Sequence, residues 1–134
     1  KRDMNNKKID KKNDSLSSYL VLNIEGYEVL VGKNNKQNDC ITFRVANKED
    51  IWFHVKDNSG SHVLLRKKTN IDVSEELLRK CASIAAYYSK CKDSSKVEVQ
   101  YTTIKFIKKP KNSRPGFVTF SKYNSIMVEP KRAT

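Results

Sequence analysis

Short runs of alternating hydrophobic and polar residues fill the first half of the chain and predict strands. Residues 19–24 and 27–31 are rich in β-branched and aromatic side chains, and Glu25 and Gly26 separate them. A glycine in a two-residue connection supplies the positive φ that a tight hairpin turn needs. The two runs therefore predict an antiparallel hairpin.

The period changes after residue 32. In residues 36–46, Ile41 and Val45 recur four positions apart, which favours a short helix capped by Asn34 or Asn35. The alternating pattern then returns in several segments. They predict strands at residues 51–56, 61–66, 97–107, 117–120 and 126–128, the last two forming a pair about residues 123–124.

The clearest helical pattern covers residues 72–90. Asp72 followed by Glu75 gives a capping signal, and apolar residues then repeat at helical spacing: Leu77, Leu78, Cys81, Ile84, Ala85 and Tyr88. Since the connections between the predicted strands are short, we expect an α+β fold. It should have a mostly antiparallel sheet of about seven strands, one long packed helix and one short helix.

The polar and apolar distribution also predicts the domain limits. Residues 1–14 are almost wholly polar and cannot bury enough surface to fold alone, so we expect a disordered linker tail over residues 1–18. Residues 19–130 should form one domain, and residues 131–134 a short tail.

Charge narrows the class of partner. The chain has 27 Lys and Arg against 15 Asp and Glu, a net charge of +12, which attracts polyanions such as nucleic acid or, second, an anionic membrane. No apolar run approaches the roughly 20 residues of a membrane span, and no signal peptide opens the sequence. We therefore expect a cytoplasmic protein without a membrane partner.

Residues 50–66 mix aromatic, basic and hydroxyl side chains. With a strand period of two, Trp52, His54 and Lys56 share one face. One interpretation is a nucleic-acid platform, in which Trp52 and His54 stack on bases while Lys56 and Arg66 neutralise phosphates. The other is that Trp52 anchors the core and His54 is an ordinary strand residue. The turn at residues 59–62 likewise fits either an anion contact of its backbone N–H groups or a plain turn.

A basic loop follows the long predicted strand. Four cations fall within seven positions: Lys108, Lys109, Lys111 and Arg114. Lys105 precedes them, and residues 66–68 form a second basic cluster. Concentrated positive charge repels itself unless an anion relieves it, so phosphate contact is one explanation and a solvated loop the other. The two clusters form a continuous basic stripe only if they lie on the same side of the sheet.

Catalysis and metal binding find little support. His54 and His62 lie near Ser59, Ser61 and Asp57, but the sequence has no nucleophile elbow, HExxH, paired carboxylates or Walker loop. We expect no enzyme. The two histidines lack a third ligand at useful spacing, so no metal or cofactor is expected. The cysteines, Cys40, Cys81 and Cys91, form no CxxC pair and are expected to be reduced.

Several motifs in series nevertheless support a family. Residues 35–39 together with Thr42, Arg44 and Ala46 are followed in order by DIWFHVKD, GSHVLLR, the helix at 82–89, VQYTTIKFIKKP and RPGFVTF. This series, over roughly residues 19–130, resembles the NFACT-R domain. That domain is the C-terminal RNA-binding module of the RqcH, Tae and NEMF family of ribosome quality-control proteins, whose bacterial members were long labelled fibronectin- or fibrinogen-binding.

The resemblance implies a function. Members of the family bind the large ribosomal subunit carrying a stalled peptidyl-tRNA and recruit charged tRNA, so that C-terminal tails are added without mRNA. By this resemblance the chain should be an RNA-binding module that contacts tRNA or ribosomal RNA and works with the remaining domains of a longer protein. It should not synthesise tails alone. The alternative is a fibronectin- or fibrinogen-binding adhesin or another protein-interaction module.

The resemblance also implies site residues. The central motif matches at Asp50, Trp52, His54, Gly60, Ser61 and His62, and the later motif at Lys105, Lys108, Lys109, Pro115 and Gly116. The expected RNA-binding residues are Arg44, Trp52, His54, Lys56, Ser61, His62, Arg66, Lys105, Lys108, Lys109, Lys111 and Arg114. Two positions depart from the family pattern: Ser59 stands where Pro is common, and Gln100 where Asp is common.

Overall fold

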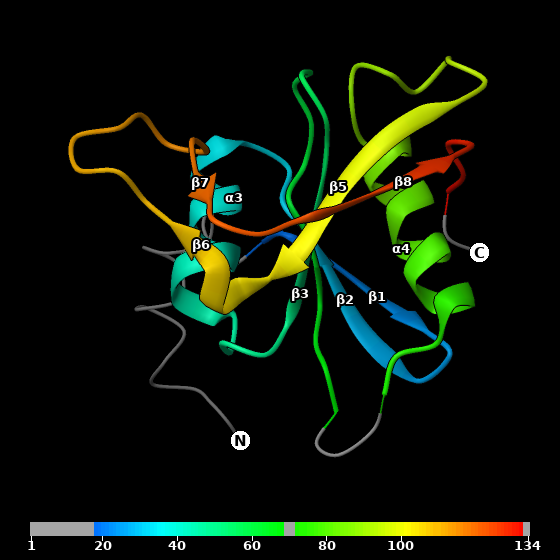
Figure 1. The fold of residues 1–134 in the computed structure, drawn as a ribbon, viewed down its shortest axis with the longest axis horizontal. Coiled ribbons are helices and arrows are strands. Elements are labelled where there is room, and N and C mark those ends of the chain that lie inside the picture. The colour runs from blue at the N-terminus through cyan, green and yellow to red at the C-terminus, as the bar shows by residue number, and fades with distance from the viewer. Residues whose placement is uncertain (1–17, 69–71, 133–134) are drawn as a thin grey trace.

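The computed structural model describes residues 18–68 and 72–132, and Figure 1 shows their arrangement. Eight strands are present: β1 (Leu20–Ile24), β2 (Tyr27–Val31), β3 (Ile51–Val55), β4 (Val63–Leu65), β5 (Val97–Thr103), β6 (Ile107–Lys108), β7 (Thr119–Phe120) and β8 (Asn124–Val128). The helices are α3 (Asn35–Cys40), which continues as a π-helical turn (Ile41–Val45), α4 (Glu75–Tyr87) and a 3₁₀ turn (Ile104–Phe106). The α+β class is confirmed.

Six strands form one sheet in the order β1-β2-β4-β3-β5-β8, and every neighbouring pair is antiparallel. The first hairpin is as predicted. Glu25 and Gly26 both have positive φ, 55° and 85°, the geometry of a tight turn whose twist matches its strands. The side chain of Asn23 also accepts a hydrogen bond from the Gly26 N–H at 3.0 Å.

Helix α4 packs on one face of the sheet, where alternate strand residues such as Val29, Phe53 and Leu65 form the main core. The helix has 13 residues and is shorter at both ends than predicted. Its N-cap is Ser74, whose hydroxyl accepts a hydrogen bond from the Leu77 N–H at 3.1 Å. The predicted cap at Asp72 was wrong because Ser74 is the residue placed to accept that N–H.

Helix α3 begins where the sequence predicted. The side chain of Asn34 accepts a hydrogen bond from the Gln37 N–H at 2.9 Å. The expected single helix is divided, because Ile41–Val45 continues with the wider π-helical hydrogen bonding, in which the Ala46 N–H reaches the Ile41 carbonyl. This unit lies on the opposite side of the sheet from α4 (Figure 1).

The second face of the sheet is covered. Leu30, Leu64, Trp52 and Thr102 form a row of directly opposed residues across β2, β4, β3 and β5. All four are buried, and the π-helical turn adds Ile41 to the cluster around Leu30 and Leu64. Trp52 is therefore buried on this second face of the sheet, opposite Leu64.

The C-terminal strands differ from the prediction. The strand expected over residues 97–107 ends at Thr103, and the 3₁₀ turn redirects the chain into β6. β6 pairs with β7, whereas β8 returns to pair with β5. The predicted pairing of the last two strands was wrong because each finds a partner elsewhere.

Most of the predicted tail at residues 1–18 lies outside the described residues, as do residues 133–134. Within the described ranges no helix has the length and apolar character needed to cross a membrane.

Candidate functional site

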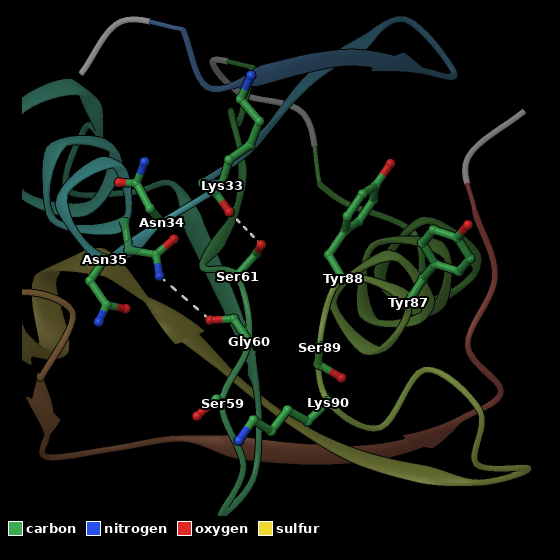
Figure 2. Close-up of a pocket in the computed structure, with 12 residues that line it drawn as sticks. Lys33, Asn34, Asn35, Ser59, Gly60, Ser61, Tyr87, Tyr88, Ser89 and Lys90 are labelled. Atoms are coloured by element: carbon green, nitrogen blue, oxygen red, sulfur yellow. Dashed lines mark hydrogen bonds between the residues drawn. The ribbon is translucent and has the colours of Figure 1, made fainter. Parts of the chain in front are cut away.

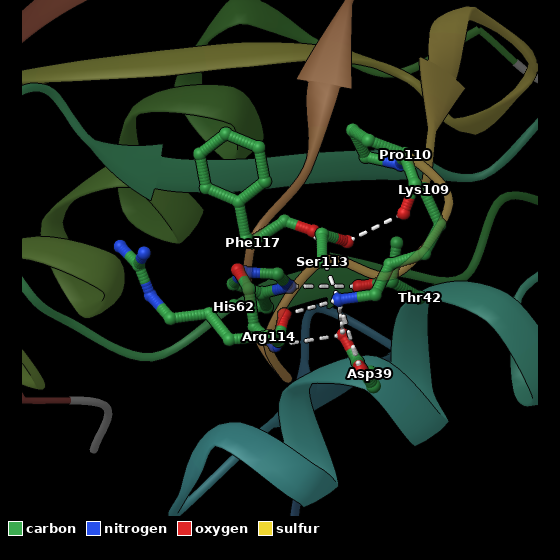
Figure 3. Close-up of polar contacts among 9 residues, drawn as sticks. Asp39, Thr42, His62, Lys109, Pro110, Ser113, Arg114 and Phe117 are labelled. Carbon is green, nitrogen blue, oxygen red and sulfur yellow. Dashed lines mark hydrogen bonds and ion pairs between the residues drawn. The ribbon is translucent and has the colours of Figure 1, made fainter.

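The basic loop, residues 108–117, is attached to α3 by an ion pair. The Nζ atom of Lys109 lies 3.2 Å from Oδ2 of Asp39 and also donates to the carbonyls of Arg114 and Phe117 (Figure 3). Asp39 in turn accepts a hydrogen bond from the Gly116 N–H at 2.9 Å. The Lys109 ammonium group thus links the two halves of the loop to each other and to α3.

His62 reinforces the same attachment. Its Nε2 lies 3.2 Å from the Gly116 carbonyl and its Nδ1 lies 2.9 Å from the Thr42 hydroxyl. A carbonyl can only accept, so Nε2 carries the proton and Nδ1 accepts from Thr42. Burial, aided by the nearby His54, lowers the pKa of His62 to about 3. This side chain is a neutral structural link.

Trp52 is enclosed by rings. His54 stacks on it at 5.8 Å between centroids, while His62 and Phe120 approach at 5.2 and 5.5 Å. Its side chain is only 1% exposed, so neither face is open to a base in this structure. His62 is also buried, at 2%. Trp52 is therefore buried, as the interpretation of it as a core residue expects. Its ring is not exposed for stacking on a base in this structure.

A buried carboxylate holds together the start of β3 and the end of β4. Asp50 is buried and accepts from the Arg66 Nε at 2.9 Å, and from the backbone N–H groups of Lys67 and Asn47. Arg66 also lies 3.6 Å from Glu28. The motif positions Asp50 and Arg66 therefore stabilise the strand ends, and Arg66 is committed to carboxylates.

A cleft opens between the basic loop and the β3–β4 turn at the other end of these strands. Its volume is about 520 Å³. We call it the loop cleft; the residues that the argument uses are His54, Asn58, Gln100, Arg114 and Phe117. Phe117 is 40% exposed, and the Arg114 guanidinium lies 5.4 Å from its ring centroid. Flat and polar groups from four segments meet here.

A second hollow of about 630 Å³ lies beside it, between the Ser59–Ser61 turn and the end of α4 (Figure 2). We call it the tyrosine pocket, because Tyr87 and Tyr88 line it together with Lys33 and Lys90. Ser61 lines it too, but its hydroxyl donates to the Gly32 carbonyl and its N–H to the Tyr88 carbonyl.

Gly60 forms the ridge between the two hollows and lines both. It bridges to Ser89, and a Cβ atom placed on Gly60 would lie 2.7 Å from the Ser89 Cβ. Only glycine lets the turn approach the end of α4 this closely. The GSH motif thus sets the wall that both hollows share.

The structure sorts the expected cations into two groups. Four are held by carboxylates: Lys56 by Glu98, Arg66 by Asp50, Lys105 by Glu49 and Lys109 by Asp39. Within the described ranges the other four have no carboxylate within ion-pair distance: Arg44, Lys108, Lys111 and Arg114. The second group is the one available to an external anion.

Three further unpaired cations, Lys33, Lys36 and Lys90, were missed by sequence reasoning. Lys33 and Lys90 line the tyrosine pocket, and Lys36 shares a smaller hollow of about 360 Å³ with Arg114. Asn35 lines all three hollows. Lys33 and Lys36 flank Asn35 in the sequence, whereas only the fold brings Lys90 to the hollow that Lys33 and Asn35 line.

The loop cleft and the second basic cluster lie beyond opposite ends of β4. Arg66 and Lys67 follow the C-terminal end of β4, whereas the loop cleft lies beyond its N-terminal end, with Ser59. Gln100 lies opposite His54 in the register of β3 and β5, and both line the loop cleft. Gln100 therefore contributes a side-chain amide to the lining of this cleft.

Comparisons with known proteins identify the family of this chain. The family model "NFACT protein RNA binding domain" matches residues 17–122. The Rqc2 homolog RqcH of Bacillus subtilis is 48% identical over 109 residues, 81% of this chain and 19% of that protein. The Rqc2 homolog RqcH of Streptococcus suis is 44% identical over 102 residues, 76% of this chain and 18% of that protein.

A solved structure is also similar. The C-terminal part of the fibronectin/fibrinogen-binding protein from Streptococcus suis superimposes with a TM-score of 0.77 and 41% identity, over 84% of this chain and 45% of that chain. The chain spans about a fifth of the length of the RqcH relatives. The matched model, the relatives and the shared fold place this chain in the NFACT RNA-binding domain family, alongside the ribosome quality-control protein RqcH.

Proposed function

We propose that this chain binds tRNA or ribosomal RNA as a module of a cytoplasmic, RqcH-like factor that acts on stalled large ribosomal subunits and supports C-terminal tailing. The proposed role is binding without catalysis. The relatives named Rqc2 homolog RqcH support the setting. The observation that carries the proposal is the group of unpaired cations around the three hollows.

These cations are Lys33, Lys36, Lys90 and Arg114. Each lines a hollow, and none has a carboxylate partner among the residues described. Neighbouring positive charges without partners repel one another, and a phosphate backbone relieves that repulsion while releasing its own counterions. The same surface offers few groups able to identify a base sequence, so we expect weak sequence preference.

A surface adhesin is less well supported. Lysine is depleted at the centres of protein–protein interfaces. Here unpaired lysines line the tyrosine pocket and the smaller hollow. The family match names RNA binding as well.

Salt dependence tests the proposal. Affinity for tRNA is measured by fluorescence anisotropy across ionic strength for the chain and for a triple variant, Lys36→Ala, Lys90→Ala and Arg114→Ala. If three phosphate contacts are lost, the slope of log affinity against log salt should flatten by about 2 units. Affinity at low salt should fall for every RNA tested.

The matched control removes the same net charge elsewhere, with Lys48→Ala, Lys67→Ala and Lys68→Ala. These side chains lie outside the three hollows and have no carboxylate partner in the described ranges. The control should keep most of the wild-type slope. Equal losses of tRNA affinity in the two triple variants would mean that only the total charge matters. If the chain did not bind tRNA at low salt, the proposed function would be rejected.

A further inference from the structure

We propose that the loop cleft takes one unstacked base of single-stranded RNA, and that the backbone crosses the Gly60 ridge toward the tyrosine pocket. This inference rests on the proposed function and adds the form of RNA that is bound. A module built to hold a duplex would need a broad surface instead of a cleft.

The size of the cleft fits one nucleotide. Its volume of about 520 Å³ lies within the roughly 300–1,000 Å³ typical of sites for small molecules. In an RNA duplex the base faces are stacked and the edges of the deep groove are out of reach of side chains. Only a nucleotide that has left a stack can enter such a cleft.

The cleft also supplies a flat partner for a base. Phe117 exposes its ring, and Arg114 lies close to it. Figure 3 shows both side chains extending away from the Lys109–Asp39 ion pair that holds their backbone. A base stacked on Phe117 would therefore meet a pre-positioned surface, and the loop would lose little conformational entropy on binding.

Amide groups line the edge of the same cleft. Asn58 and Gln100 can each offer a donor or an acceptor, so they can pair with the edge of any base. Burial lowers the pKa of His54, which stacks on the buried Trp52, so His54 contributes a neutral ring and no charge. Such a lining favours an unpaired base without selecting one identity.

Phosphates have partners on both sides of the ridge. Arg114 and Lys36 share a hollow on the side of the loop, and Lys90 lies on the other side, in the tyrosine pocket. The Lys90 N–H donates to the Ser59 carbonyl at 3.0 Å, which keeps this residue beside the ridge. A strand with one base in the loop cleft could place its neighbouring phosphates near all three cations.

The test compares two RNA forms. A labelled single strand of about 10 nucleotides, a length typical of single-strand sites, is titrated against the chain beside a blunt duplex of the same sequence. We expect the single strand to bind about 10-fold more tightly, and Phe117→Ala to weaken that binding about 10-fold. The variant should leave duplex binding nearly unchanged.

Phe43→Ala is the matched control. Phe43 is 38% exposed, close to the 40% of Phe117, and it does not line the cleft. This substitution should leave the affinity for both RNA forms unchanged, and thermal unfolding confirms that the variants fold. Arg114→Gln gives a second variant, which should weaken single-strand binding without removing the ring.

Trp52 provides a spectroscopic readout through His54, which stacks on it and lines the loop cleft. It is the single tryptophan of the chain and lines the loop cleft. Adenosine 5′-monophosphate should change its fluorescence in the wild type and much less in Phe117→Ala. Equal affinity for both RNA forms, or no effect of Phe117→Ala, would overturn the inference while the proposed function stands. No binding of either RNA form would overturn both.

Discussion

The ammonium group of Lys109 and the carboxylate of Asp39 lie 3.2 Å apart although 70 positions separate them in the sequence. One residue comes from the basic loop and the other from α3. Lys109 matches the family motif as an expected RNA contact, and in this structure its ammonium group is held by the Asp39 carboxylate and by the carbonyls of Arg114 and Phe117. The Lys109 ammonium group fixes the backbone at residues 114 and 117, whose side chains line the loop cleft.

Substitution of Lys109 should therefore cost stability. Lys109→Met removes an ion pair and two hydrogen bonds at a side chain that is 27% exposed, so we expect the free energy of unfolding to fall by about 1–3 kcal/mol. Urea denaturation measures the change. Lys108→Met is the control, because Lys108 is exposed and has no ion pair among the residues described, and it should have almost no effect. Equal stability of the two variants would contradict a structural role for Lys109.

Gly116 should be sensitive to any side chain. Its φ is 87°, and an added Cβ would lie 2.8 Å from Oδ1 of Asn35. Gly116→Ala should destabilise the protein by about 1–2 kcal/mol and weaken RNA binding by displacing the loop. Gly26→Ala carries a similar backbone penalty at φ 85°, far from the hollows. If Gly26→Ala weakened RNA binding as much, the effect would reflect stability alone.

Because burial lowers the pKa of His62, we expect the protein to lose stability in acid. The pKa of His62 is about 3 in the folded chain, mainly because of burial, and lies near the ordinary 6.5 in the unfolded chain. Between these values the unfolded chain binds a proton that the folded chain does not, so stability should fall by about 1.4 kcal/mol per pH unit as pH drops below 6.5. Above pH 6.5 this contribution is fully present.

Urea denaturation between pH 7 and pH 5 measures that slope. His62→Gln should be less stable than the wild type at pH 7 and should show a flatter dependence on pH. His54 also has a lowered pKa because of burial, so it contributes a slope of the same sign. An unchanged slope in His62→Gln would show that His62 is not the group that titrates.

The start of α4 gives a test of the capping geometry. Ser74→Ala removes the acceptor for the Leu77 N–H and should reduce the free energy of unfolding by about 1 kcal/mol. Asp72→Ala should change it by less, since its side chain makes no hydrogen bond in the described residues. Thermal unfolding of both variants distinguishes the two caps. A larger effect of Asp72→Ala would restore the cap predicted from the sequence.

Local patterns predicted much of the fold. The hairpin at Glu25 and Gly26 and the cap at Asn34 depend on a few neighbouring residues, so the sequence contains what determines them. The pairing of β6 with β7 is different. Each of these strands has two residues, and their meeting depends on where the 3₁₀ turn after Thr103 sends the chain.

The candidate site was predicted less completely, and charge is the reason. The sequence alone does not show whether a lysine forms an ion pair with a carboxylate, because the partner is brought close by the fold. Lys105 and Lys109 proved to be paired, while Lys36 and Lys90 proved to be unpaired and close to the cleft. Trp52 raised a similar ambiguity, because the period of two identifies a face of the sheet and cannot say what covers it.

The second half of the basic loop, residues 114–117, is held through its main chain. The carbonyls of Arg114, Gly116 and Phe117 and the N–H of Gly116 make the contacts with Lys109, His62 and Asp39. Side chains at 114, 115 and 117 are therefore not needed to keep the loop in place. These side chains could change during evolution, and the preferred ligand with them, while the main-chain contacts that hold the loop are kept. An engineer could vary the same three positions in a library and retain a folded protein.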